Sequence, residues 1–246
     1  MKLDDLVTEL GKSNSFDEKS GLLADAVISR IGPPVADIAL MCGLIHWFNE
    51  GVIKRLLNES YQAEDTINTI LSLPFVEVRG SGFVFHNSTR SGLLLLYRRQ
   101  PEKIVEAYSK ALPELLNDLD NDDDAAIAVA YGLIATNDSR TDDMVSSLVG
   151  RFIAKYQINT LKIFVEEIKE VLWLSNEKIF SPKRWIQIGW LQFANGKFND
   201  VISSCEQALR VDPGSEEALL LRATTKKVES DFDSALSDLN EVISIN

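Results

Sequence analysis

The feature that most constrains this chain is a pattern near its C-terminal end that occurs twice, 34 residues apart. The first copy combines an aromatic residue, an aliphatic residue, small residues, a turn glycine and a closing proline: Trp185, Ile188, Gly189, Gly196, Phe198, Ala208 and Pro213. Glycine can adopt the positive φ of a turn between helices, and proline ends a helix because it cannot continue the hydrogen-bond ladder. The pattern therefore predicts antiparallel helix hairpins over residues 182–246.

This spacing resembles that of tetratricopeptide repeats, which are helix hairpins of 34 residues. The second copy begins near Glu216 and places four residues one step after their counterparts: Leu219, Ala223, Phe232 and Ala235. The resemblance covers about a quarter of the chain. It implies a protein that binds other proteins or peptides rather than a catalyst. The second copy stops at Asn246 without a closing proline, which leaves open both self-association through this end and a longer protein that continues the repeats.

Upstream of the repeats, the pattern of apolar residues, prolines and glycines predicts a winged helix. Three helices are expected over residues 35–45, 50–57 and 63–73. They are followed by two short strands, 75–79 and 83–86, which the turn Gly80-Ser81-Gly82 joins into a hairpin. We expect this hairpin to be the only β-structure, packed on the first and third helices.

Residues 34–115 resemble the winged-helix segment of STAND signal-transduction ATPases. The resemblance rests on the hairpin, on His86 at the entry to the next helix, and on Arg98-Arg99 shortly before Pro101. It implies a place in a signalling assembly, since in that family the segment leads into helical repeats. The family's nucleotide-binding module is expected to be absent from these 246 residues.

The expected fold is therefore mainly α, with a winged helix followed by helical hairpins and tetratricopeptide repeats. We predict an N-terminal helical segment over residues 1–33, the winged helix over 34–100, a helical connector over 101–181 and the repeats over 182–246. Within the connector, an apolar stripe predicts a helix over 161–174.

Composition narrows the classes of partner. The net charge of −12 and the pI of about 4.7 disfavour phosphate backbones and anionic membranes as partners. No apolar run approaches the roughly 18–20 residues that span a bilayer, and the N-terminus lacks the apolar core of a signal peptide. Cys42 and Cys205 are expected to be buried free thiols, which favours a cytoplasmic location.

Each short motif that resembles a ligand-binding or metal site lacks residues that such a site requires. Gly11-Lys12-Ser13 lacks the earlier glycine of a phosphate-binding loop, because that position is Leu6. The alternating aspartates of residues 118–124 lack the glycine and glutamate of a calcium loop. His46 and His86 have no cysteine or histidine neighbour at ligand spacing. We therefore predict no catalytic residue, no metal ligand and no cofactor, including no ATP.

A winged helix also suggests DNA binding, which is the alternative function. The helix that would enter the major groove, residues 62–73, carries Glu64 and Asp65 but no lysine or arginine. The wing offers only Arg79, and Asn68 alone could read a base. The residues therefore favour protein partners over nucleic acid, and leave a transcriptional regulator as the second hypothesis.

The expected partner-binding surface lies on the first helices of the two repeats. Five residues are placed on their inward positions: Ile186, Trp190, Phe193, Leu220 and Lys227. An apolar peptide groove is one interpretation of these side chains. The other is that Trp190 packs against the helix predicted over 161–174. Either way, the function predicted for the chain is that of a non-catalytic scaffold or regulatory module that binds a protein.

Overall fold

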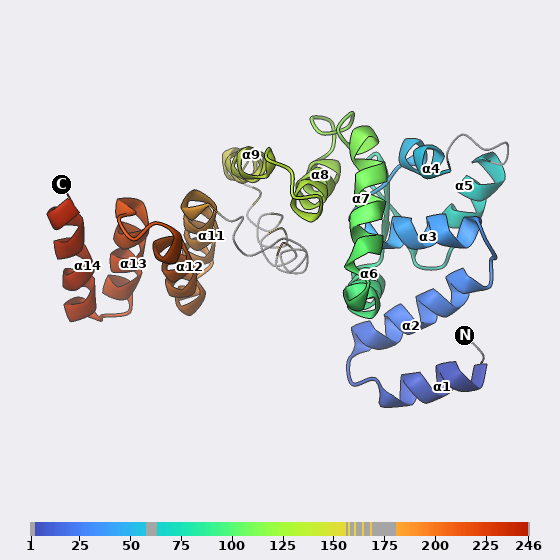
Figure 1. The fold of residues 1–246 in the computed structure, drawn as a ribbon, viewed down its shortest axis with the longest axis horizontal. Helices are drawn as coiled ribbons and strands as arrows, with labels where there is room; N and C mark the ends of the chain where they lie inside the picture. Colours follow the sequence, from blue (N-terminus) through green and yellow to red (C-terminus); the bar gives the residue numbers. More distant parts are fainter. Residues whose placement is uncertain are drawn as a thin grey trace. The chain divides into compact units, whose positions relative to one another are not determined.

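A computed structural model describes residues 3–57, 63–155, 157, 160, 164, 168 and 181–245. In this part of the chain there are 13 α-helices and one β-hairpin, so the mainly α fold predicted from the sequence is confirmed. The chain divides into two compact units; among the described residues, the first ends at Asp138 and the second begins at Ser139 (Figure 1). This boundary falls inside the segment that was expected to be a connector.

The first unit contains eight helices, a short 3₁₀ helix and the hairpin. In chain order these are α1 Leu3–Lys12, α2 Phe16–Ser29, α3 Val35–Leu44, α4 Glu50–Leu56, α5 Ala63–Leu71, β1 Val76–Arg79, β2 Gly82–Phe85, α6 Asn87–Leu96, η1 Tyr97–Arg99, α7 Pro101–Leu115 and α8 Asp123–Ala135. The second unit contains α9 Thr141–Ala154, α11 Pro182–Ala194, α12 Phe198–Val211, α13 Glu216–Val228 and α14 Phe232–Ile245.

The winged helix is formed by α3, α4 and α5 followed by the antiparallel pair β1 and β2. The strands pair in the register Val76↔Phe85 to Arg79↔Gly82, and they are the only strands in the described residues. The chain before α4 adds a bridge between Phe48 and Phe83. Strand β2 contacts α3 and β1 contacts α5. The predicted hairpin and its packing on these two helices are therefore confirmed.

Local residues explain where these elements begin. The side chain of Asn49 accepts a hydrogen bond from the backbone N–H of Val52 at 2.8 Å, and thus caps α4 as its position in the sequence predicts. Trp47, Phe48 and Phe85 are almost fully buried, so the aromatic run before α4 anchors the hairpin to the core.

Helices α2 and α6 cross at two glycines. A Cβ atom on Gly21 would collide with the backbone of Gly92, and one on Gly92 would collide with the carbonyl oxygen of Asp17. The obstacles are backbone atoms, which cannot move aside as a flexible side chain can. These two helices can therefore approach so closely only because neither residue has a side chain.

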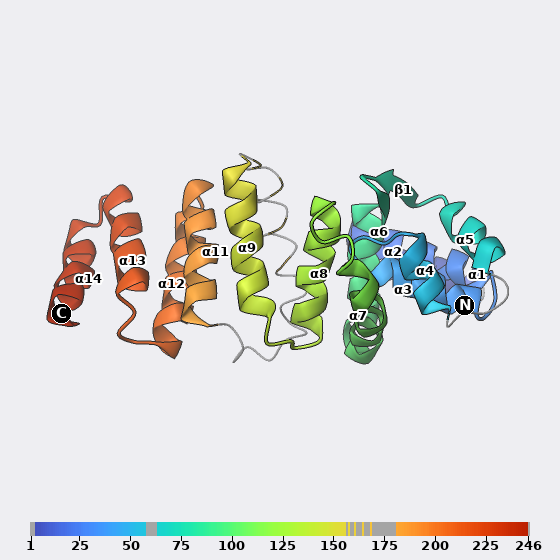
Figure 2. The ribbon, with the colours of Figure 1, turned by 90° about the horizontal axis from the view of Figure 1, so that it is seen from above.

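In the second unit, α11 is held to α9 by polar contacts. The buried guanidinium of Arg184 lies 2.5 Å from a carboxylate oxygen of Asp142. Gln187 Nε2 also donates a hydrogen bond to Ser146 Oγ at 2.7 Å. The helices α11 to α14 then lie side by side as two hairpins (Figure 2).

The helix expected over residues 161–174 lies mostly outside the described residues. Only Phe164 and Ile168 of that stretch are described, and both are helical and buried. The ring of Phe164 packs edge-on against Phe152 of α9, with 6.1 Å between centroids.

The crossing of α2 and α6 gives a test of the fold. Replacing Gly92 with alanine should lower the free energy of unfolding by about 1–3 kcal/mol, because the added methyl group overpacks a backbone contact. Urea denaturation monitored by circular dichroism would measure the change. Gly11→Ala is the matched control: no atom lies near its Cβ position in α1, so it should be neutral or stabilising by up to about 1 kcal/mol. Equal effects of both substitutions would contradict the proposed crossing.

Candidate protein-binding surface

The two C-terminal hairpins have matching backbones. Gly196 lies in the turn between α11 and α12 and has a φ of +69°, which suits glycine. Ser230, 34 positions later, lies in the turn between α13 and α14 with a φ of +66°. The second turn therefore keeps the left-handed conformation although it has lost the glycine. This agreement supports a tetratricopeptide-like repeat in α11 to α14.

The second hairpin packs against the first at Gly189, where the missing side chain leaves a small hollow. A Cβ on Gly189 would lie 2.8 Å from Leu221 Cδ2 and 3.9 Å from the sulfur of Cys205. Leu221 of α13 thus occupies the space that the missing side chain leaves between α11 and α12. The surrounding core is apolar and almost fully buried, and consists of Ile186, Val201, Cys205, Ala208, Ala218 and Leu221.

Each hairpin also holds its two helices together with a polar bridge at the same position. In the first hairpin, Ser204 Oγ donates a hydrogen bond to Gln192 Oε1 at 2.7 Å. In the second, Lys226 Nζ contacts Asp238 Oδ2 at 3.0 Å, 34 positions further on for both partners. Asp238 is 3% exposed, so its charge requires such partners.

Arg222 completes the bridge in the second hairpin. It makes two hydrogen bonds to the carboxylate of Asp238, at 2.7 and 3.0 Å. These bonds raise the pKa of Arg222 above its usual value. A neutral bridge in one repeat is therefore replaced by a largely buried ionic bridge at the equivalent positions of the next.

Three aromatic residues gather beside the first turn. The ring of Trp190 packs edge-on against Phe193, with 5.9 Å between centroids, and Phe193 lies 5.6 Å from Phe198. Trp190 is 43% exposed and Phe193 is half-buried. Trp190 therefore presents a large apolar surface to solvent from a fixed position.

The five residues that were predicted to form the surface differ in their exposure to solvent. Leu220 and Lys227 of α13 are exposed, as is Trp190 of α11. Ile186 is 3% exposed and belongs to the core between the hairpins, so the expectation that it faces an open groove is wrong. The reason is its place on the helix: Ile186 lies one turn before Gly189, on the side that α13 covers.

A second apolar surface was missed by sequence reasoning. Helices α13 and α14 enclose an open groove of about 460 Å³. It is lined by Ala223, Thr224, Lys227, Phe232, Ala235, Leu236 and Leu239. The 34-residue spacing could have identified it, because Leu239 is the counterpart of Cys205 in the core of the first hairpin.

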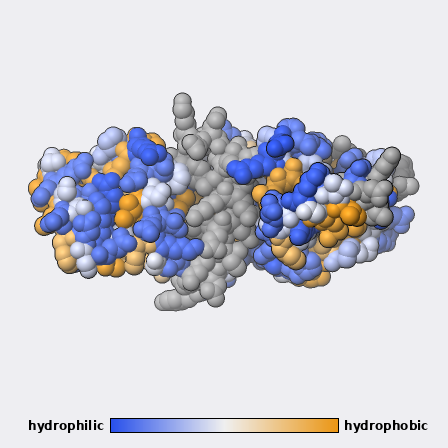
Figure 3. Space-filling model, turned by 90° about the horizontal axis from the view of Figure 1, so that it is seen from below, coloured by the Kyte–Doolittle hydropathy of each residue, from blue (hydrophilic) through white to orange (hydrophobic). Residues whose placement is uncertain are grey.

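On the face seen in Figure 3, apolar residues lie among hydrophilic ones on both units.

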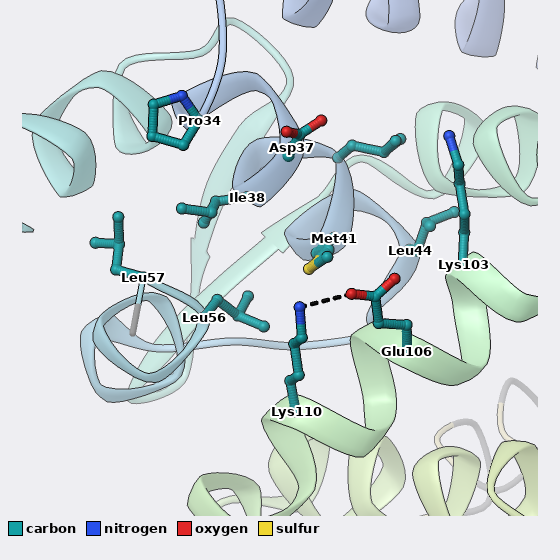
Figure 4. A pocket seen from close by; sticks show the side chains of 11 residues that line it. Pro34, Asp37, Ile38, Met41, Leu44, Leu56, Leu57, Lys103, Glu106 and Lys110 are labelled. Carbon is teal, nitrogen blue, oxygen red and sulfur yellow. Dashed lines mark hydrogen bonds and ion pairs between the residues drawn. The ribbon is translucent and has the colours of Figure 1, made fainter. Parts of the chain in front are cut away.

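The first unit has a hollow of its own beside the winged helix. It lies between α3, α4 and α7, has a volume of about 470 Å³ and is open to solvent (Figure 4). Its floor is apolar, with Ile38, Met41 and Leu56 among the lining residues. On its rim, Lys110 pairs with Glu106 at 2.6 Å, so part of the charge there is neutralised within α7.

The turn of the wing is bound to the start of α8. Both the backbone N–H and the hydroxyl of Ser81 donate to Asp122 Oδ2, at 2.8 and 2.9 Å. The other carboxylate oxygen of Asp122 accepts from the backbone N–H groups of Asp124 and Ala125, and so caps α8. Arg79, the cation of the wing, pairs with Glu77 at 2.8 Å. Acidic side chains of the same unit therefore bind both the turn and the arginine of the wing.

The remaining motifs have structural roles in the described residues. Lys12 ends α1 and pairs with Glu9 at 2.8 Å, whereas a phosphate-binding loop would precede a helix. His46 is buried and lies 3.3 Å from Asp124. His86 lies 3.3 Å from Glu77. In this part of the chain no group of three potential metal ligands comes together.

Both cysteines are buried free thiols. Burial raises the pKa of the Cys205 thiol to about 12, and raises the pKa of Cys42 well above its usual range. Neither sulfur is therefore a reactive thiolate near neutral pH. Among the residues described, no helix combines the length and the apolar character that crossing a bilayer requires.

Comparisons with known proteins are short or distant. No protein-family model matches the chain. A segment of 49 residues, 20% of this chain, is 39% identical to mouse Sperm-associated antigen 1 and spans 5% of that protein. The crystal structure of MamA aligns with 80% of this chain and 95% of its own, at 13% identity and a TM-score of 0.34. The tetratricopeptide-like character of α11 to α14 therefore rests on their own geometry.

The buried thiols predict how stability depends on pH. An unfolded thiol titrates near pH ~8.5, whereas the folded thiols keep their protons to higher pH. The folded state thus binds more protons in this interval, and its stability should fall as the pH rises from 8 to 10, by at most ~1.4 kcal/mol per pH unit for each thiol. Urea denaturation at several pH values would measure the slope. A Cys42→Ala/Cys205→Ala variant with the same slope would refute this explanation.

Proposed function

We propose that this chain is a protein-binding module whose contact surface lies on the first helices of its two tetratricopeptide-like hairpins. The observation that carries the proposal is the exposure of Trp190 at 43% and of Leu220 at 42% on α11 and α13. Tryptophan is among the residues on which binding energy concentrates at protein interfaces, and Leu220 adds apolar area. Lys227 is exposed two turns after Leu220 on α13, which would favour a partner with an acidic residue near its apolar contact.

The resemblance of residues 34–115 to the winged-helix segment of STAND proteins supports a regulatory role in a signalling assembly. In such a role the first unit would be a folded spacer or a second contact site, and the repeats would bind the partner. The buried free thiols favour a reducing, cytoplasmic setting.

We do not propose a catalytic role. The histidines and cysteines are engaged in the fold of their units, as described above. A nucleophile would need a base within hydrogen-bond reach and a site that a substrate can enter. Both thiols are buried, so a substrate does not reach them.

DNA binding by the winged helix finds little support in its geometry. Glu64 and Asp65 occupy the first turn of α5, the helix that would enter the major groove. Arg79 is paired with Glu77, and the wing turn is bound to Asp122. A duplex would have to displace these acidic partners and then meet a chain of net charge −12.

The proposed surface predicts that Trp190 serves binding more than folding. A photocrosslinking amino acid at position 190 should yield adducts with a partner protein in the cells that make this chain, because the side chain reaches solvent. The matched control carries the same group at Glu206, an exposed position on α12. Equal adducts from both positions, or adducts from the control alone, would argue against the surface.

Stability measurements on the purified chain complete this test. Trp190→Ala should cost about 1 kcal/mol, the scale of a lost aromatic pair. Phe152→Ala in the same unit removes a fully buried ring and should cost about 3–5 kcal/mol. If both substitutions cost the same, Trp190 belongs to the core and the surface does not exist.

The alternative function predicts a different result in a gel shift. With random duplex DNA at two salt concentrations, the chain should produce no shifted band at micromolar concentration, because the charges repel. A shifted band that weakens as salt rises would support the winged helix as a DNA reader, especially if Arg79→Ala abolished it.

A further inference from the structure

The hydrogen bonds of the wing show which backbone groups of strand β1 point away from the hairpin. Phe48 and Phe83 exchange two backbone hydrogen bonds, at 3.0 and 2.8 Å. Both polar backbone groups of Phe83 therefore point toward Phe48 and away from β1. Val78 lies opposite Phe83 in the register of the hairpin, so these two residues form a pair without mutual hydrogen bonds. The N–H and C=O of Val78 consequently point outward, at the free edge of β1.

Val78 is also accessible to another strand. It is 76% exposed, the highest fraction of any large apolar residue that the structure describes. Outside the hairpin, no described residue forms a hydrogen bond with its backbone, and β1 lies at the margin of the first unit in Figure 2. At the other outward-facing position, Val76, the N–H already donates to the carbonyl oxygen of Leu73 at 3.1 Å. Val78 is therefore the centre of an open strand edge, which is a template for pairing with another chain.

The charges of β1 indicate what pairs with this edge. We infer that β1 of a second copy of the chain pairs with it in antiparallel orientation, with Val78 of one copy opposite Val78 of the other. In this register Glu77 of each copy lies opposite Arg79 of the other. Opposite charges at facing positions stabilise a strand pair. The two-fold symmetry of such a dimer makes each favourable pair form twice.

Other registers of the same two strands bring like charges together. If Val76 lay opposite Val78 of the second copy, Glu77 would face Glu77. If Val78 lay opposite Gly80, Arg79 would face Arg79. Like charges directly opposite each other destabilise a strand pair. Charge therefore selects the register that is centred on Val78.

The side chains on the two faces of β1 suit this pairing. Successive side chains of a strand point to opposite faces, so Glu77 and Arg79 share one face and Val78 lies on the other. Within one copy, Arg79 Nη2 lies 2.8 Å from Glu77 Oε1, and both side chains remain partly exposed. Four charges of alternating sign would line one face of the dimer, and the two Val78 side chains would meet on the other. This inference goes beyond the proposed function and does not depend on it, because the surface around Trp190 lies in the other unit.

Disulfide trapping tests the register. Residues that exchange hydrogen bonds across an antiparallel pair have Cα atoms about 5.5 Å apart, a separation that a disulfide spans. Val78→Cys should therefore form a covalent dimer under mild oxidation at least about tenfold faster than Val211→Cys, because pairing raises the effective concentration of the two thiols. Val211 is the matched control, since it is another exposed valine and lies on α12 of the second unit. The natural cysteines are buried.

Charge reversal tests the pairing without added thiols. Sedimentation velocity should show a monomer–dimer equilibrium at concentrations up to about 0.5 mM, because so small a contact gives a weak affinity. Glu77→Arg should weaken dimerisation by about tenfold or more, and Glu77→Arg/Arg79→Glu should restore it, because opposite charges face each other again. Val78→Lys should abolish the dimer, whereas Val211→Lys should leave it unchanged. Circular dichroism melts would verify that each variant is folded.

Three results would overturn the inference. The first is a chain that stays monomeric at these concentrations, or a Val78→Cys variant that crosslinks no faster than the control. The second is a dimer that persists in Val78→Lys or is lost in Trp190→Ala, since another surface would then hold it. The third is slow amide hydrogen exchange of Val78 in the dilute monomer, which would show that the chain itself covers this edge. The substitution at Trp190 also keeps failure of this inference distinct from failure of the proposed function.

Discussion

The second unit depends on the contact in which Leu221 of α13 occupies the space left by Gly189 of α11. A Cβ atom at position 189 would lie 2.8 Å from Leu221 Cδ2, so the leucine side chain would have to shift from this space. With glycine there, α13 contacts both helices of the first hairpin and encloses an apolar core that includes Ile186 and Cys205. Burial of this core supplies most of what holds short helices together, since isolated helices of this length are marginal in water.

The same contact explains why matching residues in the two hairpins behave differently. The second hairpin repeats the turn conformation and the polar bridge of the first, although Ser230 replaces Gly196 and an ionic bridge replaces an amide–hydroxyl pair. Its apolar positions, however, face a groove instead of a helix. The exposure of these side chains therefore depends on what lies next to the hairpin rather than on the backbone of the hairpin itself.

In the first unit, the turn of the wing is bound by a side chain of the same unit. Its hairpin has the form of a wing, but Asp122 binds the turn and simultaneously caps α8. The turn is tight enough that a Cβ on Gly80 would collide with the carboxylate of Asp122. A single acidic side chain thus joins the wing to the following helices, which suits a packing role better than contact with phosphate groups.

The sequence by itself determined the local structure: the hairpin, the Asn49 cap and the helix pairs follow from turn residues, caps and a 34-residue spacing that act over short distances. It also indicated that Trp190 and Leu220 could form a surface. Only the tertiary structure decided that Ile186 is buried, that Leu239 lines a groove and that Asp122 holds the wing. The physical reason is that burial depends on neighbours distant in the chain, whereas helix and turn formation depend mainly on adjacent residues.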